Sequence, residues 1–402
     1  VFNLLKNIEI LSLESRRLKN TSKSIVIDYG EDGLLASSKE ESLRAITSIS
    51  CRILIEMSLC PITQDCKEAS QSDIDHLMAL ASEMYSYANS SDSIHYNLND
   101  SCQVRIHNNG LISMDLNELI SVTNEYLTGY FLDTFEISEK EYNELYSDHI
   151  NYLEQGDLFE FEEAFYNEYQ IQLSDFTKIF QALIYFSERK KLAVVEISVG
   201  SLLDKLKDTV NLQVVKSFVS RFCFTPRTVW ESTNQDSNFP WRFQRKLSLS
   251  FQPVILIENK LDFKQSKLIY GIQFIENSFR NIFSGIEQGW IDSSIFDSKR
   301  MKSLLGAKAE QLGNEFEKLV HNICLDNQWN SKHSVKMEFF GAPSKLGDVD
   351  VLVWSNHSNK IYALECKRLK MCRTARDIGR LLSKFRGDPS NNDDKLTKHI
   401  NR

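Results

Sequence analysis

Two carboxylates and a lysine near the C-terminus have the types and spacing for metal-dependent chemistry. Asp350 lies in the run 347–354, and Glu365 and Lys367 lie in the run 360–367. Mg²⁺ prefers oxygen ligands, lowers the pKa of a bound water and offsets charge that builds on a phosphate. A neighbouring lysine can hold or deprotonate the attacking water and stabilise negative charge. Together these residues predict the hydrolysis of a phosphodiester.

Two strands and a turn are needed to position these side chains. Apolar and polar residues alternate in both runs, which predicts a strand for each, and the polar residues 355–359 predict a hairpin turn between them. Side chains two apart share a face of a strand. We therefore expect Glu365 and Lys367 to project together and Asp350 to join them from the paired strand. Cys366 is expected to point the other way, into apolar packing.

These residues resemble the signature of the PD-(D/E)xK nuclease superfamily, which has the restriction-endonuclease-like fold. That signature is a strand aspartate followed by Glu-x-Lys on the next strand. The tripeptide from Glu365 to Lys367 matches the second part. Asp350 matches the first part, and Asp348 is the competing aspartate on the same strand face.

Many members of this superfamily carry a further glutamate on a helix before the strands, often within Gly-x-x-Phe-Glu. Residues 313–317 read Gly-Asn-Glu-Phe-Glu and are followed by apolar residues at helical spacing. Glu317 is therefore the match, and Glu315 is the alternative. The resemblance covers residues 303–402.

The resemblance implies a Mg²⁺-dependent endonuclease, with Mn²⁺ as a substitute ion. It implies a C-terminal αβββα(β) domain in which Asp350, Glu365 and Glu317 hold the metal and Lys367 acts on the attacking water. These four are the predicted catalytic residues. DNA is the implied substrate, with RNA as the alternative. Because the family core usually continues past a basic helix into a further strand, we expect the domain to be truncated at its C-terminus.

Basic side chains gather after Lys367. Residues 360–402 hold 12 Lys and Arg against 5 Asp and Glu, a net charge of +7, whereas the rest of the chain carries −15. A positive field beside the predicted site suits phosphate contacts. The alternative is a solvated basic helix face over residues 374–385 without a ligand. The predicted nucleic-acid contacts are Arg368, Lys370, Arg373, Arg376, Arg380 and Lys384, of which three arginines recur at helical spacing above the strands.

Length and composition bound the remaining architecture. A chain of 402 residues predicts two or three domains, and 15 Gly and 6 Pro over this length favour a helix-rich α/β protein. We expect a helix-rich region with a small β-hairpin at 1–190, a mixed α/β region at 191–300 and the nuclease domain at 301–402. The hairpin is predicted over residues 104–114, and a helix over 72–88.

Other sequence features exclude some classes of protein. No run approaches the roughly 18–20 apolar residues that a membrane helix needs. The eight cysteines form no Cys-x-x-Cys pair, and no His/Cys cluster has zinc spacing. Scattered thiols in apolar runs suit a reducing compartment, so a cytoplasmic location is predicted. His321, one helical turn after Glu317, is expected to be an ordinary packed or surface histidine, with an approach to the site as the alternative.

Two segments outside the C-terminal domain have ambiguous patterns. Residues 131–170 hold twelve acidic side chains and one lysine. This predicts a solvated helical pair, and the alternatives are a docking surface for a basic partner or an acidic element that competes with DNA for the basic nuclease face. Residues 239–258 mix Arg242 and Arg245 with aromatic side chains. We expect this segment to form an ordinary strand, with the two arginines as auxiliary nucleic-acid contacts.

A nuclease domain fused to a large region of this kind is typical of bacterial defence against phage or foreign DNA. The predicted function is therefore cleavage of DNA in such defence. One alternative is a catalytically silent nucleic-acid-binding scaffold. The other is a partner-activated effector subunit of a multi-protein complex, in which a protein partner or a second copy engages the N-terminal region.

Overall fold

The chain forms two compact units. The first unit contains residues 1–282 and 294–301, and the second contains residues 283–293 and 302–402. The expectation of a mixed α/β, helix-rich protein is confirmed. The structure is a computed structural model that describes residues 3–11, 36, 39–40, 43–60, 69–98, 103–110, 112–115, 155–227, 239–242, 245–289, 291–343, 347–355, 360–368 and 375–386.

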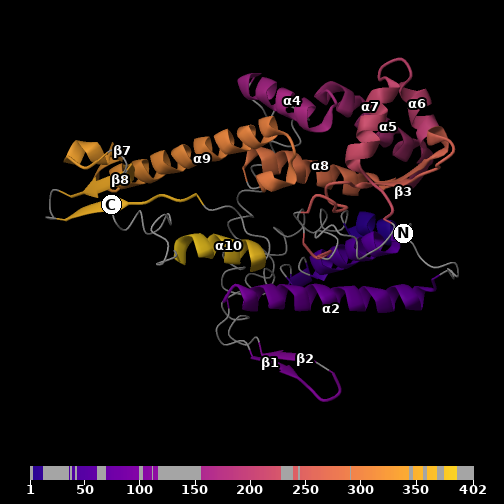
Figure 1. Ribbon diagram of the computed structural model, residues 1–402, viewed down its shortest axis with the longest axis horizontal. Helices are drawn as coiled ribbons and strands as arrows, with labels where there is room; N and C mark the ends of the chain where they lie inside the picture. Colours follow the sequence, from indigo (N-terminus) through magenta and orange to yellow (C-terminus); the bar gives the residue numbers. More distant parts are fainter. Residues whose placement is uncertain are drawn as a thin grey trace. The chain divides into compact units, whose positions relative to one another are not determined.

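The first unit is built from helices around a small mixed sheet (Figure 1). Helical residues 3–11 and 43–58 come before the labelled elements. Those elements are α2 (Gln71–His95), β1 (Gln103–Ile106), β2 (Ile112–Asp115), α4 (Gln155–Tyr169), α5 (Leu173–Lys190), β3 (Val194–Ser198), α6 (Val199–Leu206), α7 (Leu212–Phe222), β4 (Cys223–Phe224), β5 (Val254–Ile257), η2 (Phe263–Gln265), β6 (Lys267–Gly271) and α8 (Ile272–Glu287).

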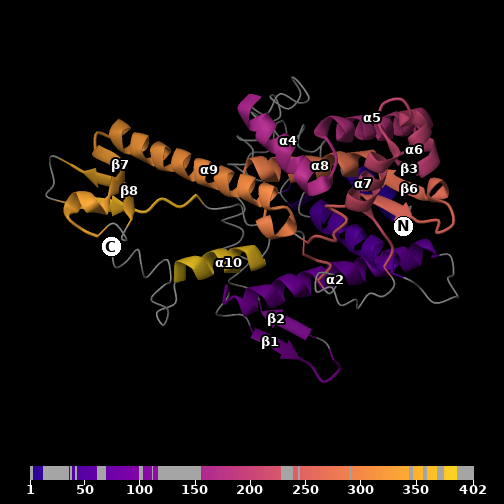
Figure 2. The same cartoon turned by 45° about the horizontal axis from the view of Figure 1, so that its top comes forward.

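Four strands form the sheet of this unit in the order β3-β6-β5-β4. β6 pairs antiparallel with both β3 and β5, whereas β4 pairs parallel with β5. Helices α5, α6 and α7 lie together beside the sheet in both views (Figures 1 and 2). The buried faces of α5 and α7 meet at Phe176 and Phe222, whose ring centroids are 5.1 Å apart. Burial of such large apolar faces is the main favourable term in folding this unit.

Local sequence signals explain two elements of the N-terminal part. The hairpin predicted over 104–114 is confirmed as β1 and β2, whose turn contains Gly110 at φ 81°. The helix predicted over 72–88 is α2, but it begins earlier and ends later. Ser70 caps it, because its hydroxyl accepts from the Asp73 amide while the Asp73 carboxylate accepts from the Ser70 amide.

The strand expected over 239–258 is wrong in large part, and so is the nucleic-acid contact expected of Arg245. Residues 246–251 form turns, and the strand is confined to β5. Arg245 is 2% exposed, and its guanidinium forms an ion pair with Glu56, which is also buried. Its pKa is lowered to about 9 by burial and by the charge of Arg52. Arg245 therefore holds the first unit together and does not face a ligand.

A second buried glutamate fixes the start of α8. Glu9 is 1% exposed, and its carboxylate accepts hydrogen bonds from the amides of Gln273 at 2.9 Å and Phe274 at 2.7 Å. These amides belong to the first turn of α8, where unsatisfied N–H groups favour an anion. Gly271 allows this approach, because a Cβ there would lie 2.1 Å from the Glu9 carboxylate.

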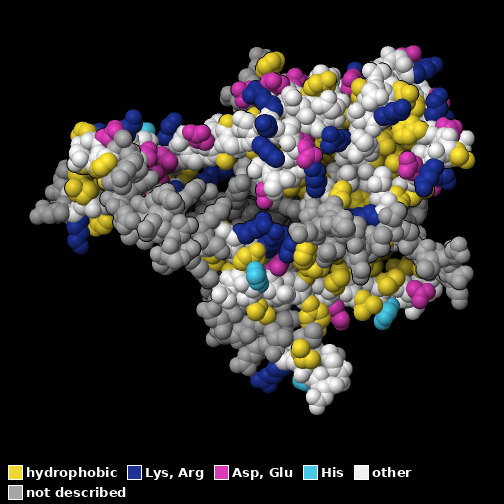
Figure 3. Space-filling model, in the orientation of Figure 1, with side chains coloured by type: hydrophobic (Ala, Val, Ile, Leu, Met, Phe, Trp, Pro, Cys, Tyr) yellow, Lys and Arg dark blue, Asp and Glu magenta, His cyan; other side chains and the backbone are white. Residues whose placement is uncertain are grey.

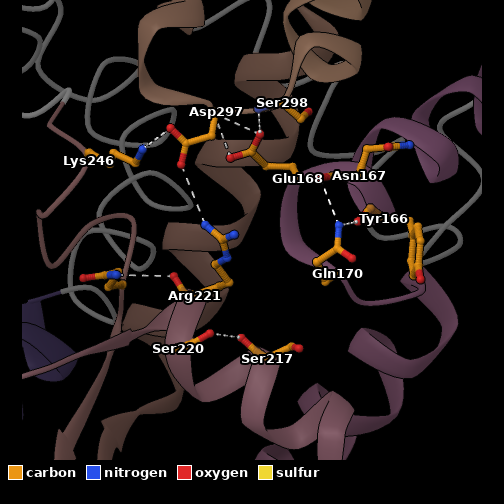
Figure 4. A network of polar contacts seen from close by, with 11 residues as sticks. Tyr166, Asn167, Glu168, Gln170, Ser217, Ser220, Arg221, Lys246, Asp297 and Ser298 are labelled. Atoms are coloured by element: carbon orange, nitrogen blue, oxygen red, sulfur yellow. Dashed lines mark hydrogen bonds and ion pairs between the residues drawn. The ribbon is translucent and has the colours of Figure 1, made fainter.

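The start of the long helix α9 (Lys299–Asp326) is fixed in the same way (Figure 4). The buried carboxylate of Glu168 accepts from the amides of Asp297 at 3.0 Å and Ser298 at 2.7 Å. The Asp297 carboxylate in turn forms ion pairs with Lys246 and Arg221. Charged side chains from three segments thus hold the residues that lead into α9.

The second unit is smaller and contains a three-stranded antiparallel sheet in the order β7-β8-β9. Its buried apolar side chains include Val335, Val351 and Val353. In the part of the chain that the structure describes, no helix is long and apolar enough to cross a membrane. The elements of this unit after α9 are β7 (Asn330–Lys336), η4 (Met337–Phe340), β8 (Asp348–Trp354), β9 (Ile361–Leu364) and α10 (Ala375–Arg386).

Candidate active site

The β8–β9 hairpin positions Asp350. Val351 pairs with Leu364, so continuing the register places Asp350 opposite Glu365. Asp350 is 9% exposed, whereas Asp348 on the same strand is exposed. The Asp350 carboxylate accepts a hydrogen bond of 2.6 Å from the backbone amide of Cys366. Asp350 therefore lies near the start of β8, beside the end of β9.

The strand predicted over 360–367 is shorter than expected. β9 ends at Leu364, and Glu365, Cys366 and Lys367 follow it. The physical reason is that the Cys366 amide donates to the side chain of Asp350 and not to a ladder carbonyl. Glu365 and Lys367 nevertheless meet as expected, because their side chains form an ion pair with exposed fractions of 34% and 48%.

Glu317 approaches this edge from helix α9. Its pKa is raised by burial first, and then by the charges of Asp350 and Asp348, while Lys367 and a hydrogen bond with the Ser334 side chain lower it. The structure therefore brings Glu317 within electrostatic reach of both aspartates and the lysine. The alternative residue, Glu315, accepts a hydrogen bond of 2.9 Å from Gln311.

The pKa of Asp350 depends on the same surroundings. Burial raises this pKa and the hydrogen bond from the Cys366 amide lowers it. The charges of Glu365 and Asp348 raise it, and the charge of Lys367 lowers it. We call Glu317, Asp348, Asp350 and Glu365 with Lys367 the acidic cluster, a set of four carboxylates and one ammonium linked by their effects on the pKa values of Glu317 and Asp350 and by the Glu365–Lys367 ion pair. Neighbouring carboxylates raise each other's pKa because like charges in one small volume repel.

Two members of this neighbourhood were not found from the sequence. Ser334 on β7 acts on Glu317 and has a backbone φ of 53°, a left-handed conformation that is uncommon outside glycine. The Cys366 thiol is half-buried, and burial together with three carboxylates raises its pKa to about 11. The expectation that the Cys366 side chain points into apolar packing stays a prediction, because the half-burial of the thiol does not fix its direction. Ser334 could not be found from the sequence because its position depends on the register of β7 with β8, which only the structure gives.

His321 packs against β7. Its Nδ1 lies 2.8 Å from the Ser331 hydroxyl, and its ring meets His333 edge to face at 5.1 Å between centroids. This is the packed histidine that the sequence favoured. It extends the polar surroundings of Glu317 along one side of α9.

The predicted nucleic-acid contacts are only in part described. Arg368 donates to the carbonyl of Gln288 at 3.0 Å, and Arg380 lies 3.7 Å from the carboxylate of Asp292. Both arginines are exposed and are bound to the segment between α8 and α9. Arg376 is half-buried on α10. Lys370 and Arg373 lie outside the described residues, as does the side chain of Lys384.

The chemistry of the acidic cluster fits a hard divalent cation, but the ligands are not gathered. Among the described residues, no group of three His, Cys, Asp or Glu side chains is placed to hold a metal ion. Burial is the main reason that the pKa values of Asp350 and Glu317 are raised, and the charges of neighbouring carboxylates raise them further. A cation would relieve that repulsion, because carboxylate oxygens are its preferred ligands.

Comparisons with known proteins address the whole chain. No curated protein and no solved structure gives a significant match. A family model described as "Anti-phage protein Upx-like" matches residues 1–402. The comparison shows no PD-(D/E)xK nuclease family, and the description of the matching family supports the expected role in defence against phage. The chain belongs to the Upx-like family of anti-phage proteins.

Proposed function

We propose that the second unit hydrolyses phosphodiester bonds of DNA with the help of Mg²⁺ and that this activity serves defence against phage. The observation that carries the proposal is that Glu317, Asp350, Glu365 and Lys367, from three separate segments, act on one another as charges. The succession α9, β7, β8, β9, α10 supports it, because it follows the αβββα order of the resemblance.

Each residue has a role in this reaction. Asp350, Glu365 and Glu317 would hold the ion, with Mn²⁺ as a substitute. The ion, when bound, would supply a water of lowered pKa and offset charge on the phosphate. Lys367 orients the attacking water and stabilises the negative charge that develops as the P–O bond breaks. The leaving oxygen departs with a proton from solvent.

Cleavage of plasmid DNA tests the proposal. Asp350→Ala and Lys367→Ala should each lower the Mg²⁺-dependent rate by about 10²-fold or more, because each removes a group that acts on the transition state. Asp348→Ala is the matched control: it removes an exposed carboxylate two residues away on the same strand, and its effect should be much smaller. Cleavage that survives both Asp350→Ala and Lys367→Ala would refute the site.

One observation favours a partner-activated form of this function. Lys367 is paired with Glu365. This ion pair has to open before Glu365 can hold an ion and Lys367 can act on an attacking water. In a partner-activated effector the purified chain is silent, and extract from phage-infected cells starts cleavage that Asp350→Ala abolishes. Activity of the purified chain alone would exclude this form.

A further inference from the structure

We propose that His333 and Ser334 form a relay of hydrogen bonds that positions the carboxylate of Glu317 to hold the metal ion. The Ser334 hydroxyl forms a hydrogen bond with Glu317, and it lies 3.2 Å from Nδ1 of His333. The relay thus connects two neighbouring residues of β7 with a side chain of α9. This inference rests on the proposed function and names two positioning residues for it.

The direction of the two hydrogen bonds follows from their protons. The bond from Ser334 lowers the pKa of Glu317, so the hydroxyl donates to the ionised carboxylate. A hydroxyl has one proton, and toward His333 its oxygen can therefore only accept. His333 must then carry a proton on Nδ1, which fixes the tautomer of the neutral ring. Both hydrogen bonds are thus donated in one direction, toward Glu317.

The backbone of Ser334 brings its hydroxyl to α9. Ser331 and His333 lie on the face of β7 that α9 covers, because both contact His321. Side chains alternate along a strand, so a regular β7 would carry Ser334 on the other face. The φ of 53° at Ser334 breaks this alternation, and the hydroxyl reaches Glu317.

The distorted residue lies beside the proposed chemistry. The ladder between β7 and β8 continues on both sides of Ser334, at His333 and Val335, and its register places Ser334 opposite Asp350. A left-handed conformation is unfavourable for serine and persists only where the surrounding structure holds it. Outliers of this kind are concentrated in functional sites. The break in β7 thus coincides with a residue of β8 that the proposed reaction uses.

Helix α9 contacts both ends of the relay. Glu317 and His321 are one helical turn apart, on the same side of α9. The His321 ring meets the His333 ring edge to face, with 5.1 Å between centroids. This contact restricts the rotation of the ring that donates to Ser334. Figure 3 shows acidic and histidine side chains together on the surface at this end of α9.

The relay matters because Glu317 is a proposed ligand of the metal ion. Hydrogen bonds to a ligating side chain orient it, and their loss typically lowers metal affinity or activity by about 10- to 100-fold. Without the relay, the Glu317 side chain regains rotamers that point away from Asp350. We therefore expect weaker binding of the ion in variants that break the relay.

Binding of Mn²⁺ to the full chain tests the relay without requiring cleavage, and the electron paramagnetic resonance signal of the free ion measures it. His333→Gln and Ser334→Ala should each weaken binding about tenfold. His333→Asn should retain the affinity, because the Asn amide nitrogen takes nearly the position of Nδ1 and donates in its place. The double variant His333→Gln/Ser334→Ala should lose no more than Ser334→Ala alone, because the two residues act in series.

His107→Gln is the matched control for the histidine variants. Nε2 of His107 lies 2.9 Å from the Ser113 hydroxyl, which is a second exposed contact between histidine and serine on paired strands, in the first unit. This variant should bind Mn²⁺ like the parent. A loss equal to that of His333→Gln would show that the change of histidine to glutamine acts on the whole chain and would overturn the relay.

Nuclear magnetic resonance of isotope-labelled histidine rings gives an independent test of the hydrogen bonds. His333 should carry a proton on Nδ1 in the parent and should lose that preference in Ser334→Ala, because the acceptor is gone. A proton on Nε2 alone in the parent, or the same tautomer in both proteins, would overturn the relay.

The remaining outcomes separate the relay from the proposed function. Unchanged Mn²⁺ affinity in His333→Gln, equal losses in His333→Asn and His333→Gln, or additive losses in the double variant would each overturn the positioning role. A parent that binds no Mn²⁺ would overturn that role together with the metal site. Expected Mn²⁺ affinities and ring spectra in a chain that cuts no DNA would refute the proposed hydrolysis and support the relay.

Discussion

One cluster of charged side chains from each compact unit can be compared, and the two differ in charge balance and solvent access. In the first unit, the arginine–glutamate cluster holds Arg52 and Arg245 against Glu56, with exposed side-chain fractions of 3%, 1% and 0%. In the second unit, the acidic cluster sets several carboxylates against Lys367, and the Glu365–Lys367 pair is partly exposed.

The difference separates a cluster that is structural from the cluster that we propose to be functional. Every oxygen of Glu56 has a donor: Arg52 at 3.2 Å and the Leu249 amide at 2.9 Å on one side, and Arg245 on the other. Such a closed set leaves no room for a ligand and rigidifies the core. The acidic cluster keeps uncompensated negative charge near solvent, and perturbed carboxylates of that kind are typical of functional sites.

Removing Glu56 should give the largest effect. Glu56→Ala leaves two buried guanidinium groups without their shared carboxylate, so the free energy of unfolding should fall by about 3–5 kcal/mol. Chemical denaturation with circular dichroism measures it. Glu40→Ala is the matched control, because Glu40 forms an exposed pair with Arg44 at the same i, i+4 spacing and should cost less than about 1 kcal/mol. Similar losses in both variants would remove the distinction between the two kinds of ion pair.

Glu9 should make the stability of the first unit depend on pH. Burial raises its pKa from 4.5 to about 7, although the amides of Gln273 and Phe274 oppose the shift. A carboxyl whose pKa is raised by folding stabilises the fold below pH 4.5, and that contribution is lost as the pH rises through 7. Between pH 4.5 and 8 the parent should lose on the order of 3 kcal/mol relative to Glu9→Gln.

Thermal unfolding across that pH range measures the effect of Glu9. Glu276→Gln is the control, because the Glu276 charge helps to raise the pKa of Glu9. That variant should move the loss of stability to lower pH without abolishing it. Parallel pH profiles for the parent and Glu9→Gln would show that this carboxyl does not titrate with folding.

Replacement of Ser334 should give the smallest of these effects, and it tests whether Glu317 takes part in the acidic cluster. Its hydrogen bond lowers the pKa of Glu317, so Ser334→Ala should raise that pKa further. The acidic limb of the pH–rate profile for DNA cleavage should then move to higher pH, with about a tenfold loss of activity on that limb. Ser331→Ala, which removes a hydroxyl next to His321 on the same strand, should leave the limb in place. A uniform loss at every pH would assign Ser334 a structural role.

Local patterns in the sequence predicted much of the second unit. The alternation around Asp350 and the polar residues 355–359 predicted the β8–β9 hairpin, and the spacing around Glu317 predicted the helix. These features depend on neighbours in the chain. The end of β9 at Leu364 was missed, because it depends on a side chain of the paired strand that takes the Cys366 amide.

Patterns that depend on distant partners were misinterpreted. Arg245 among aromatic residues was expected to contact nucleic acid, but its partner Glu56 is 189 positions away in the chain. Ser334 was missed for a related reason. Its place near Glu317 depends on how β7 pairs with β8, and the sequence of the segment between the two strands does not determine that pairing. Neither composition nor periodicity carries that information.

By itself, the sequence determined the types and order of the chemical groups: a helical glutamate, a strand aspartate, Glu-x-Lys and a basic segment. These follow from short-range backbone preferences and side-chain periodicity. The tertiary structure decided which charges are balanced. It enclosed Glu56 between two arginines and left Glu317 and Asp350 repelling each other beside Lys367. The reason is physical: desolvation and Coulomb energies depend on distances between groups that only packing brings together.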